Sequence, residues 1–154
     1  MTDLMQLCAF NAAYANTIDS DALEIWPTYF TEICHYRVTH IENEREGLAA
    51  GIVYANSRAM LEDRISALRE ANIYERHSYR HMIGIPLITA SADDAIEAST
   101  PFMVARIMHT GQTELFATGS YQDKFVRTDG KLLLSRRVAV CDSTVTDTLL
   151  ALPL

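Results

Sequence analysis

Residues 57–70, SRAMLEDRISALRE, carry the clearest hydrophobic pattern in the chain. Apolar side chains recur at steps of three and four residues through Leu61, Ile65 and Leu68, which is the spacing of one buried helical stripe. Arg64 falls inside this stripe, and a guanidinium held against a core needs carboxylate or carbonyl partners. The pattern therefore predicts a helix whose Arg64 takes part in an internal ion pair or in a contact with another subunit.

The chain before this helix changes from helical to alternating patterning. Residues 4–18 have approximately helical spacing, and residues 19–21, Asp-Ser-Asp, supply caps for a second helix that Pro27 interrupts. Residues 34–40 alternate as in a strand with one buried face. A short strand is also expected at residues 52–54, after a connection that contains two glycines.

The chain after this helix has the patterning of strands. Residues 79–88 read as one strand, in which Pro86 favours an edge or a bulge. Residues 102–109 are apolar at almost every position, so we expect a strand covered on both faces. Residues 113–126 form a further strand, and the sequence Thr-Asp-Gly-Lys at residues 128–131 is a hairpin signal that leads into the last strand.

Helices followed by strands indicate an α+β fold, with N-terminal helices packed on one face of a mostly antiparallel sheet. The length of 154 residues suits a single domain spanning residues 1–154. The apolar end of the chain, residues 144–154, is expected to pack on its own domain or on a neighbour. Three helices followed by long strands that curl around them resemble the cone-shaped fold of the nuclear transport factor 2 superfamily. The strong curvature is implied by that resemblance.

The charge of the chain is acidic overall and uneven along its length. Thirteen Lys and Arg against twenty Asp and Glu give a formal net charge of −7, which disfavours nucleic acid as a partner. Basic residues nevertheless gather within residues 64–81 and at Arg136 and Arg137. Basic residues that gather in this way are most often solvated surface charges. Arg64, however, does not lie on the polar face of its helix.

The cysteines and the N-terminal sequence indicate a cytoplasmic protein. Cys8, Cys34 and Cys141 are odd in number and far apart, which suits a reducing compartment better than a disulfide framework. No basic stretch followed by an apolar region begins the chain, and no apolar run reaches membrane-spanning length. We therefore expect neither secretion nor a membrane partner.

Motifs for metals and cofactors are missing from the sequence. His40-Ile41-Glu42 has the H-x-E spacing of some mononuclear iron sites, but such a site needs a second His from elsewhere in the fold. The paired Cys and His of a Rieske cluster are lacking, as are a Gly-rich phosphate loop and a nucleophile elbow. We expect no catalytic, cofactor-binding or metal-binding residues in this chain.

Acid–base chemistry is the alternative that the residues leave open. Relatives of the cone fold catalyse isomerisation or dehydration with Asp, His and Tyr side chains that line the cone, and burial tunes the pKa values of such groups. Core packing with a hydrogen-bonded hydroxyl is the commoner role of tyrosine. A stand-alone isomerase or dehydratase would draw on Tyr14, Asp19, Tyr29, Tyr36, His81 and His109. A third reading is a small-molecule-binding or oligomeric scaffold without an enzyme partner.

Several sequence motifs together resemble the small (beta) subunit of Rieske-type aromatic-ring-hydroxylating dioxygenases. With the N-terminal helices they span nearly the whole chain. They are AMLEDRISALR at residues 59–69, the Arg-His of residues 79–81, the strand at 101–106, the strand end and turn at 124–130, and LLLSRRVAVCDSTV at 132–145.

This resemblance implies a division of labour between two kinds of subunit. In the family the large (alpha) subunit holds the Rieske [2Fe-2S] cluster and the mononuclear Fe(II), and three copies of each subunit form an alpha3beta3 hexamer. The reaction adds both atoms of O₂ to an aromatic ring and gives a cis-dihydrodiol, with electrons from NAD(P)H passed on by a reductase component. The small subunit is usually structural.

The partners implied for this chain are therefore the alpha subunit, further copies of itself and, indirectly, the reductase. Obligate interfaces are large and apolar, and Arg is among the residues they favour. The residues we expect to serve in structural or interface contacts are Arg64, Arg80, His81, Arg136 and Arg137.

Overall fold

The computed structural model describes residues 1–45, 53–71, 75–143 and 152–154. The expected connection before residue 53 and most of the apolar end of the chain lie outside these residues. In chain order the elements are α1 (Asp3–Asp19), the 3₁₀ helix η1 (Trp26–Tyr29), β1 (Phe30–His40), α2 (Ile41–Arg45), β2 (Val53–Ser57), α3 (Arg58–Ala71), β3 (His77–Ile83), β4 (Leu87–Ser91), β5 (Ala95–Met108), β6 (Thr113–Thr128) and β7 (Lys131–Cys141).

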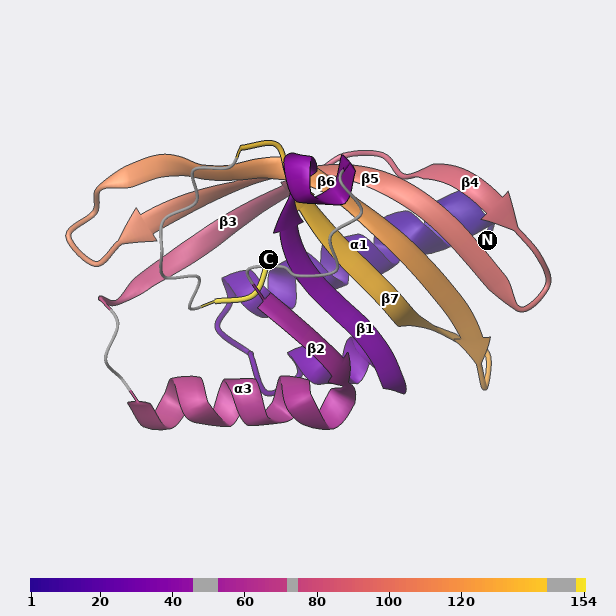
Figure 1. Ribbon diagram of the computed structural model, residues 1–154, viewed down its shortest axis with the longest axis horizontal. Helices are drawn as coiled ribbons and strands as arrows, with labels where there is room; N and C mark the ends of the chain where they lie inside the picture. The colour runs from indigo at the N-terminus through magenta and orange to yellow at the C-terminus, as the bar shows by residue number, and fades with distance from the viewer. Residues whose placement is uncertain (46–52, 72–74, 144–151) are drawn as a thin grey trace.

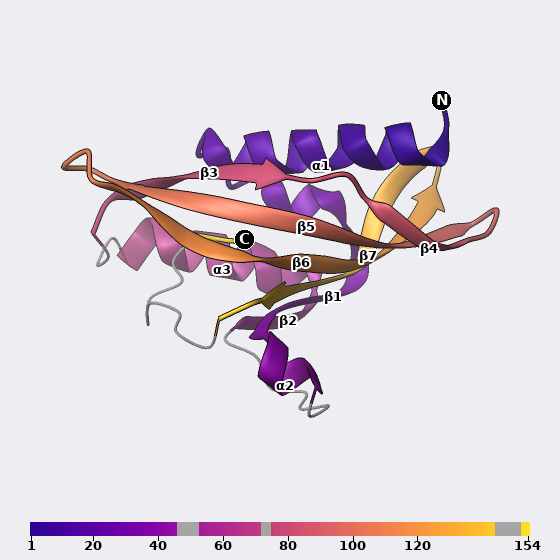
Figure 2. The same cartoon turned by 90° about the horizontal axis from the view of Figure 1, so that it is seen from above.

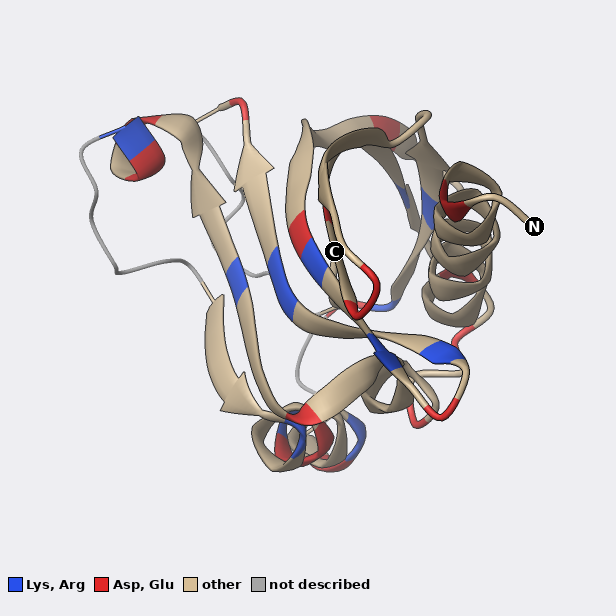
Figure 3. Cartoon of the chain, turned by 90° about the vertical axis from the view of Figure 1, so that its right-hand side faces the viewer, with Lys and Arg blue, Asp and Glu red and all other residues tan. Residues whose placement is uncertain are grey.

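Seven strands of the described residues form one mixed sheet in the order β2-β1-β7-β6-β5-β3, and β4 pairs with β5 beside β3. The pairing of β1 with β7 is parallel and the others are antiparallel. The long strands β5, β6 and β7 fan out across the molecule (Figure 1), and α1 runs alongside β3 (Figure 2). The sheet bends strongly, with α1 on one side and α3 across one end (Figure 3). This is the expected α+β architecture.

Local signals in the sequence explain where α1 and α3 begin. The Thr2 side chain accepts a hydrogen bond from the Met5 amide at 3.3 Å, and Asp3 in the first turn suits the positive end of the helix dipole. The Ser57 hydroxyl accepts from the Met60 amide at 3.2 Å and so starts α3. The predicted helix at residues 57–70 is confirmed, with Leu61 and Ile65 buried.

The predicted second helix after residue 21 is wrong. Asp21 has φ of +62°, in the left-handed region, and the chain then makes three-residue turns such as the Trp26 amide to Leu23 carbonyl bond of 3.2 Å. Pro27 lies in the first turn of η1, where its missing N–H is tolerated. Because Phe30 is already extended, the helical segment ends after one turn.

Two expectations for the later strands also need correction. The strand predicted at residues 79–88 is divided into β3 and β4 around Gly84 and Pro86, because Pro86 has no amide to donate to a ladder. The strand predicted at 102–109 belongs to the longer β5, and only one of its faces is fully covered. Phe102 and Val104 are buried, whereas Met103 is 48% exposed.

The interior of the molecule is an aromatic core on the inward faces of β1 and β6. Trp26 lies 5.6 Å from Phe30 and 5.1 Å from Tyr36, ring centre to ring centre, in edge-to-face contacts. Tyr121 stacks on Phe102 at 4.5 Å. The predicted hairpin between β6 and β7 is confirmed, and Asp129 and Gly130 both have positive φ there, as a two-residue turn requires.

Candidate functional site

Arg137 is the most deeply buried charge in the described part of the chain. Its Nε and Nη2 donate to the two carboxylate oxygens of Asp123 at 2.8 Å each, and Nη2 also donates to Asn11 Oδ1 at 2.7 Å. Asp123 faces Arg137 directly because β6 and β7 place them in register. The guanidinium carbon lies 4.3 Å from the ring centre of Tyr14 and 3.9 Å from that of Tyr121, so two aromatic faces add cation–π attraction.

The electrostatics of this cluster suit a structural pair. Burial raises the pKa of Asp123, and the charge of Arg137 opposes that shift. Burial also raises the pKa values of the Tyr14 and Tyr121 phenols, which therefore stay protonated near neutral pH. The cluster ties α1 to β6 and β7.

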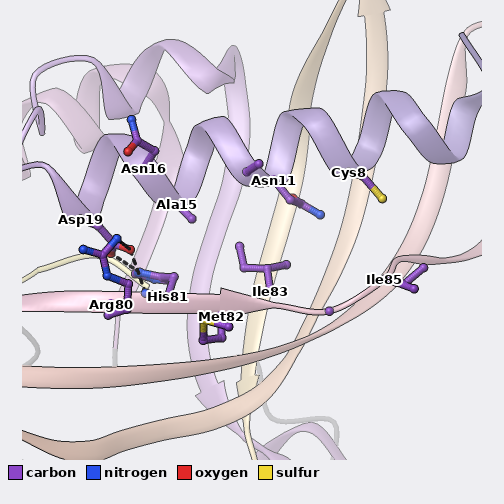
Figure 4. A pocket seen from close by; sticks show the side chains of 12 residues that line it. Cys8, Asn11, Ala15, Asn16, Asp19, Arg80, His81, Met82, Ile83 and Ile85 are labelled. Atoms are coloured by element: carbon purple, nitrogen blue, oxygen red, sulfur yellow. Dashed lines mark hydrogen bonds and ion pairs between the residues drawn. The ribbon is translucent and has the colours of Figure 1, made fainter.

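A second polar arrangement lies between α1 and β3 (Figure 4). His81 Nδ1 is 2.7 Å from Asp19 Oδ1, and the His81 backbone amide donates to Asp19 Oδ2 at 2.8 Å. Arg80 Nη1 is 4.0 Å from the same carboxylate. The pair borders a cavity of about 390 Å³ whose other walls are largely apolar, with Ile83 and Ile85 among them. Asp19 ends α1 and His81 is in β3, so the pair fixes the end of the helix on the sheet.

Within the described residues, the six residues of the acid–base alternative do not form one cluster. Asp19 and His81 pair as described, whereas Tyr14 and Tyr36 belong to the hydrophobic core and Tyr29 packs against it. Tyr29 shares a hydrogen bond of 2.8 Å with Thr17, and Tyr14 and Tyr36 bond to the main chain of Leu154. His109 is exposed beside Glu75 at 3.5 Å. Asp19 and His81 therefore pair with each other, and the tyrosine hydroxyls bond to other partners.

The five residues expected in structural or interface contacts lie in different surroundings. His81 and Arg137 are buried with partners of their own chain. Arg80 is 68% exposed, and Arg136 is 44% exposed at 3.6 Å from Glu97. Arg64 on α3 is half-buried, and its charge lowers the pKa of Tyr36 against a larger increase caused by burial. Their contacts with other subunits stay a prediction.

Asp123 is the structural residue that the sequence reasoning missed. A signal for it existed, because inward positions of β6 alternate through Tyr121, Asp123 and Phe125. A carboxylate at a core position of a strand needs a cation opposite, and the neighbouring strand contains one in Arg137. Only the register between β6 and β7 shows that Asp123 and Arg137 lie opposite each other.

The structure also bears on metals and membranes. Within residues 1–45, 53–71, 75–143 and 152–154, no three His, Cys, Asp or Glu side chains are grouped so as to hold a metal ion. No helix in these ranges is long and apolar enough to cross a bilayer. All three cysteines are free thiols.

The three thiols should differ sharply in reactivity. Cys8 is exposed, whereas Cys34 and Cys141 are buried. Burial raises the pKa of Cys34 and raises that of Cys141 to about 11, so both stay protonated and unreactive at about pH 8. A disulfide exchange reagent should label Cys8 within minutes and the other two only in denaturant. Rapid labelling of Cys141 in the native protein, read by mass spectrometry, would contradict this packing.

Comparison with known proteins decides the family. The family model described as "Ring hydroxylating beta subunit" matches residues 13–147. The chain belongs to the ring-hydroxylating beta subunit family. It is 67% identical, over 154 residues and the full length of both chains, to terephthalate 1,2-dioxygenase terminal oxygenase component subunit beta 1 of a Comamonas species. It is 38% identical to the anthranilate 1,2-dioxygenase small subunit of Burkholderia cepacia, over 92% of this chain and 88% of the relative.

A solved structure confirms the fold of this beta subunit. The beta subunit of a proposed aromatic-ring-hydroxylating dioxygenase from Novosphingobium aromaticivorans superposes with a TM-score of 0.90 at 37% identity, over 98% of this chain and 96% of that one. The expected cone of the nuclear transport factor 2 type is therefore confirmed. The family match also confirms the resemblance to the small subunit of ring-hydroxylating dioxygenases. As a ring-hydroxylating beta subunit, the chain is a component of an oxygenase, and an alpha subunit is its partner.

Proposed function

We propose that this chain is the non-catalytic beta subunit of a terephthalate 1,2-dioxygenase and that it stabilises an alpha3beta3 terminal oxygenase. The choice of terephthalate as the substrate rests on the 67% identity over the full length to the Comamonas beta subunit. The oxygenase then adds both atoms of O₂ to the ring of terephthalate and forms a cis-dihydrodiol, with electrons supplied from NAD(P)H through a reductase. The Rieske [2Fe-2S] cluster and the Fe(II) belong to the alpha subunit in this proposal, and the complex is cytoplasmic.

The polar groups of the described residues support a structural role. The buried carboxylates of Asp123 and Asp19 are both engaged by cations or imidazole of their own chain. Two of the tyrosines that an acid–base enzyme would use, Tyr14 and Tyr36, are fully enclosed. We propose that the whole chain, residues 1–154, acts as one unit that supplies shape and contacts to the oxygenase.

Co-expression tests the proposal directly. A tagged alpha subunit from the same gene cluster should retain this chain through purification, and the complex should have the mass of an alpha3beta3 hexamer by light scattering. It should consume O₂ with terephthalate when reductase and NADH are present, and phthalate and isophthalate serve as substrate controls. The purified chain alone should be colourless and inactive. Turnover by this chain without an alpha subunit, or a complex active only on another aromatic acid, would contradict the proposal.

A row of basic side chains across the sheet is the surface that we propose contacts a neighbouring subunit of the hexamer. His35 on β1, Arg136 on β7 and Lys124 on β6 are paired in register and therefore share one face. Figure 3 shows Lys and Arg positions, in blue, on neighbouring strands of the sheet. Against a net charge of −7, such a row favours an acidic partner surface.

Charge reversal at Arg136 tests this surface. Arg136→Glu should lower the amount of alpha subunit recovered with this chain by about tenfold, because it replaces attraction by repulsion at an interface. The side chain is 44% exposed with a single ion pair at 3.6 Å, so the melting temperature should change little. Lys131→Glu, at the exposed start of β7, is the matched control. If the Arg136→Glu variant retained the alpha subunit as fully as the unmodified chain, this surface would not be a subunit interface.

A further inference from the structure

Residues 152–154 lie inside the fold of their own chain. Leu152 is 4% exposed and Leu154 is 1% exposed, and Pro153 between them is also buried. The segment lies between α3 and the sheet, where the C label stands in Figure 1. Leu152 and Leu154 belong to the hydrophobic core cluster, with Leu68 of α3 packed against it. Leu152 also borders a cavity that Ile18 and Leu68 line together with polar and charged residues.

Two buried tyrosines bind the main chain of this segment. The Tyr14 hydroxyl donates to the Leu154 main-chain oxygen at 2.8 Å, and the Tyr36 hydroxyl donates to the same oxygen at 3.1 Å. The Leu154 amide in turn donates to the Tyr36 oxygen at 3.1 Å. The two tyrosines come from α1 and β1, and 140 and 118 positions separate them from Leu154.

These contacts have the composition of a binding site for a peptide. The two phenols bind a main-chain oxygen and an amide of the segment, and the hydrophobic core around Leu152 and Leu154 favours leucine side chains. Tyr14 and Tyr36 are 0% and 1% exposed, so without the segment two buried hydroxyls would lose these partners, which is unfavourable. Apolar walls combined with a few polar groups are the usual form of a ligand site.

We propose that Tyr14, Tyr36, Ile18 and Leu68 form a binding site for an apolar peptide and that residues 152–154, Leu-Pro-Leu, fill it in cis. The recognition is through the peptide main chain at Leu154 and through the leucine side chains. The site therefore accepts the same sequence as a separate molecule. This inference concerns the chain itself and does not depend on the identity of the oxygenase.

Peptide complementation tests the site. A chain that stops after residue 151 should melt at a lower temperature and bind a hydrophobic dye more strongly than the full-length chain. The peptide Leu-Ala-Leu-Pro-Leu should restore the melting temperature with saturable, one-to-one binding in calorimetry. The full-length chain should bind this peptide at least about tenfold more weakly, because its own segment competes at high effective concentration.

Matched controls separate recognition from general hydrophobic adhesion. In the shortened chain Tyr36→Phe should weaken peptide binding, whereas Tyr54→Phe, at an exposed position on β2, should not. The peptide Leu-Ala-Asp-Pro-Asp should not bind. If the shortened chain does not fold alone, peptide present during refolding should increase the yield of folded protein. An unchanged melting temperature on truncation, an equal effect of both peptides, or no rescue of stability or refolding would overturn the proposal.

Amide hydrogen exchange provides a measurement on the full-length chain. The Leu154 amide should exchange slowly in the native protein, because it is buried and donates to Tyr36. In Tyr36→Phe it should exchange about 100-fold faster, since local opening then governs the exchange rate. Exchange of this amide at the rate of an unstructured peptide in the unmodified protein would also overturn the proposal.

Discussion

Arg137→Met is expected to destabilise this beta subunit by about 3–5 kcal/mol, because it leaves the buried carboxylate of Asp123 without its cation. Both side chains are 0% exposed, so water cannot replace the lost hydrogen bonds. The substitution also removes the donor to Asn11 and the cation between the rings of Tyr14 and Tyr121. Urea unfolding followed by the fluorescence of Trp26, the single tryptophan of the chain, measures the change.

Two further variants show whether the pair itself is responsible. The double variant Arg137→Met with Asp123→Leu should recover most of the loss, because no buried charge remains uncompensated. Arg136→Met removes the neighbouring, partly exposed arginine and should change the free energy of unfolding by no more than about 0.5 kcal/mol. A double variant as unstable as Arg137→Met alone would show that the loss arises from packing and not from charge.

Gly119→Ala is expected to destabilise the protein by about 3 kcal/mol or more, because the new methyl group has no space. Its Cβ would clash with the Val140 carbonyl oxygen and would lie 3.0 Å from the Cys141 Cα. These are backbone atoms of the paired strand β7, so relief requires the two central strands to separate. The readouts are the urea midpoint and the circular dichroism of the purified variant.

Thr118→Ala is the matched control for this position. Thr118 is adjacent in β6 and donates to Asp142 at 2.9 Å in an exposed hydrogen bond. Because water can replace that partner, the loss should stay below about 1 kcal/mol. If Gly119→Ala unfolded at the same urea concentration as Thr118→Ala, the close approach of β6 and β7 at this point would be incorrect.

Short-range patterns predicted the elements that short-range interactions control. The spacing of Leu61 and Ile65 predicted α3, and the turn residues Asp129 and Gly130 predicted the last hairpin. Both signals involve residues a few positions apart, so the sequence displays them directly. The prediction of a second helix was wrong. The capping residues after α1 favour a helix, but Asp21 has a left-handed backbone conformation and Pro27 lies in the single turn of η1.

The candidate site was harder to predict because its pairs are distant in the sequence. The stripe of α3 directed attention to Arg64 as the buried cation, but the fully buried arginine is Arg137. Its partner Asp123 lies 14 positions away across a strand pair, and a shift of one residue in register would turn both side chains to the other face. Asp19 and His81, 62 positions apart, meet only because α1 packs along β3.

The sequence by itself determined the helix α3, the terminal hairpin and membership of a beta subunit family, because these depend on local periodicity and on motifs read in order. Only the tertiary structure decided which arginine is buried, which carboxylate neutralises it, and that residues 152–154 return to Tyr14 and Tyr36. The physical reason is that strand register and sheet curvature set these contacts, and both are properties of the assembled sheet that no single segment carries.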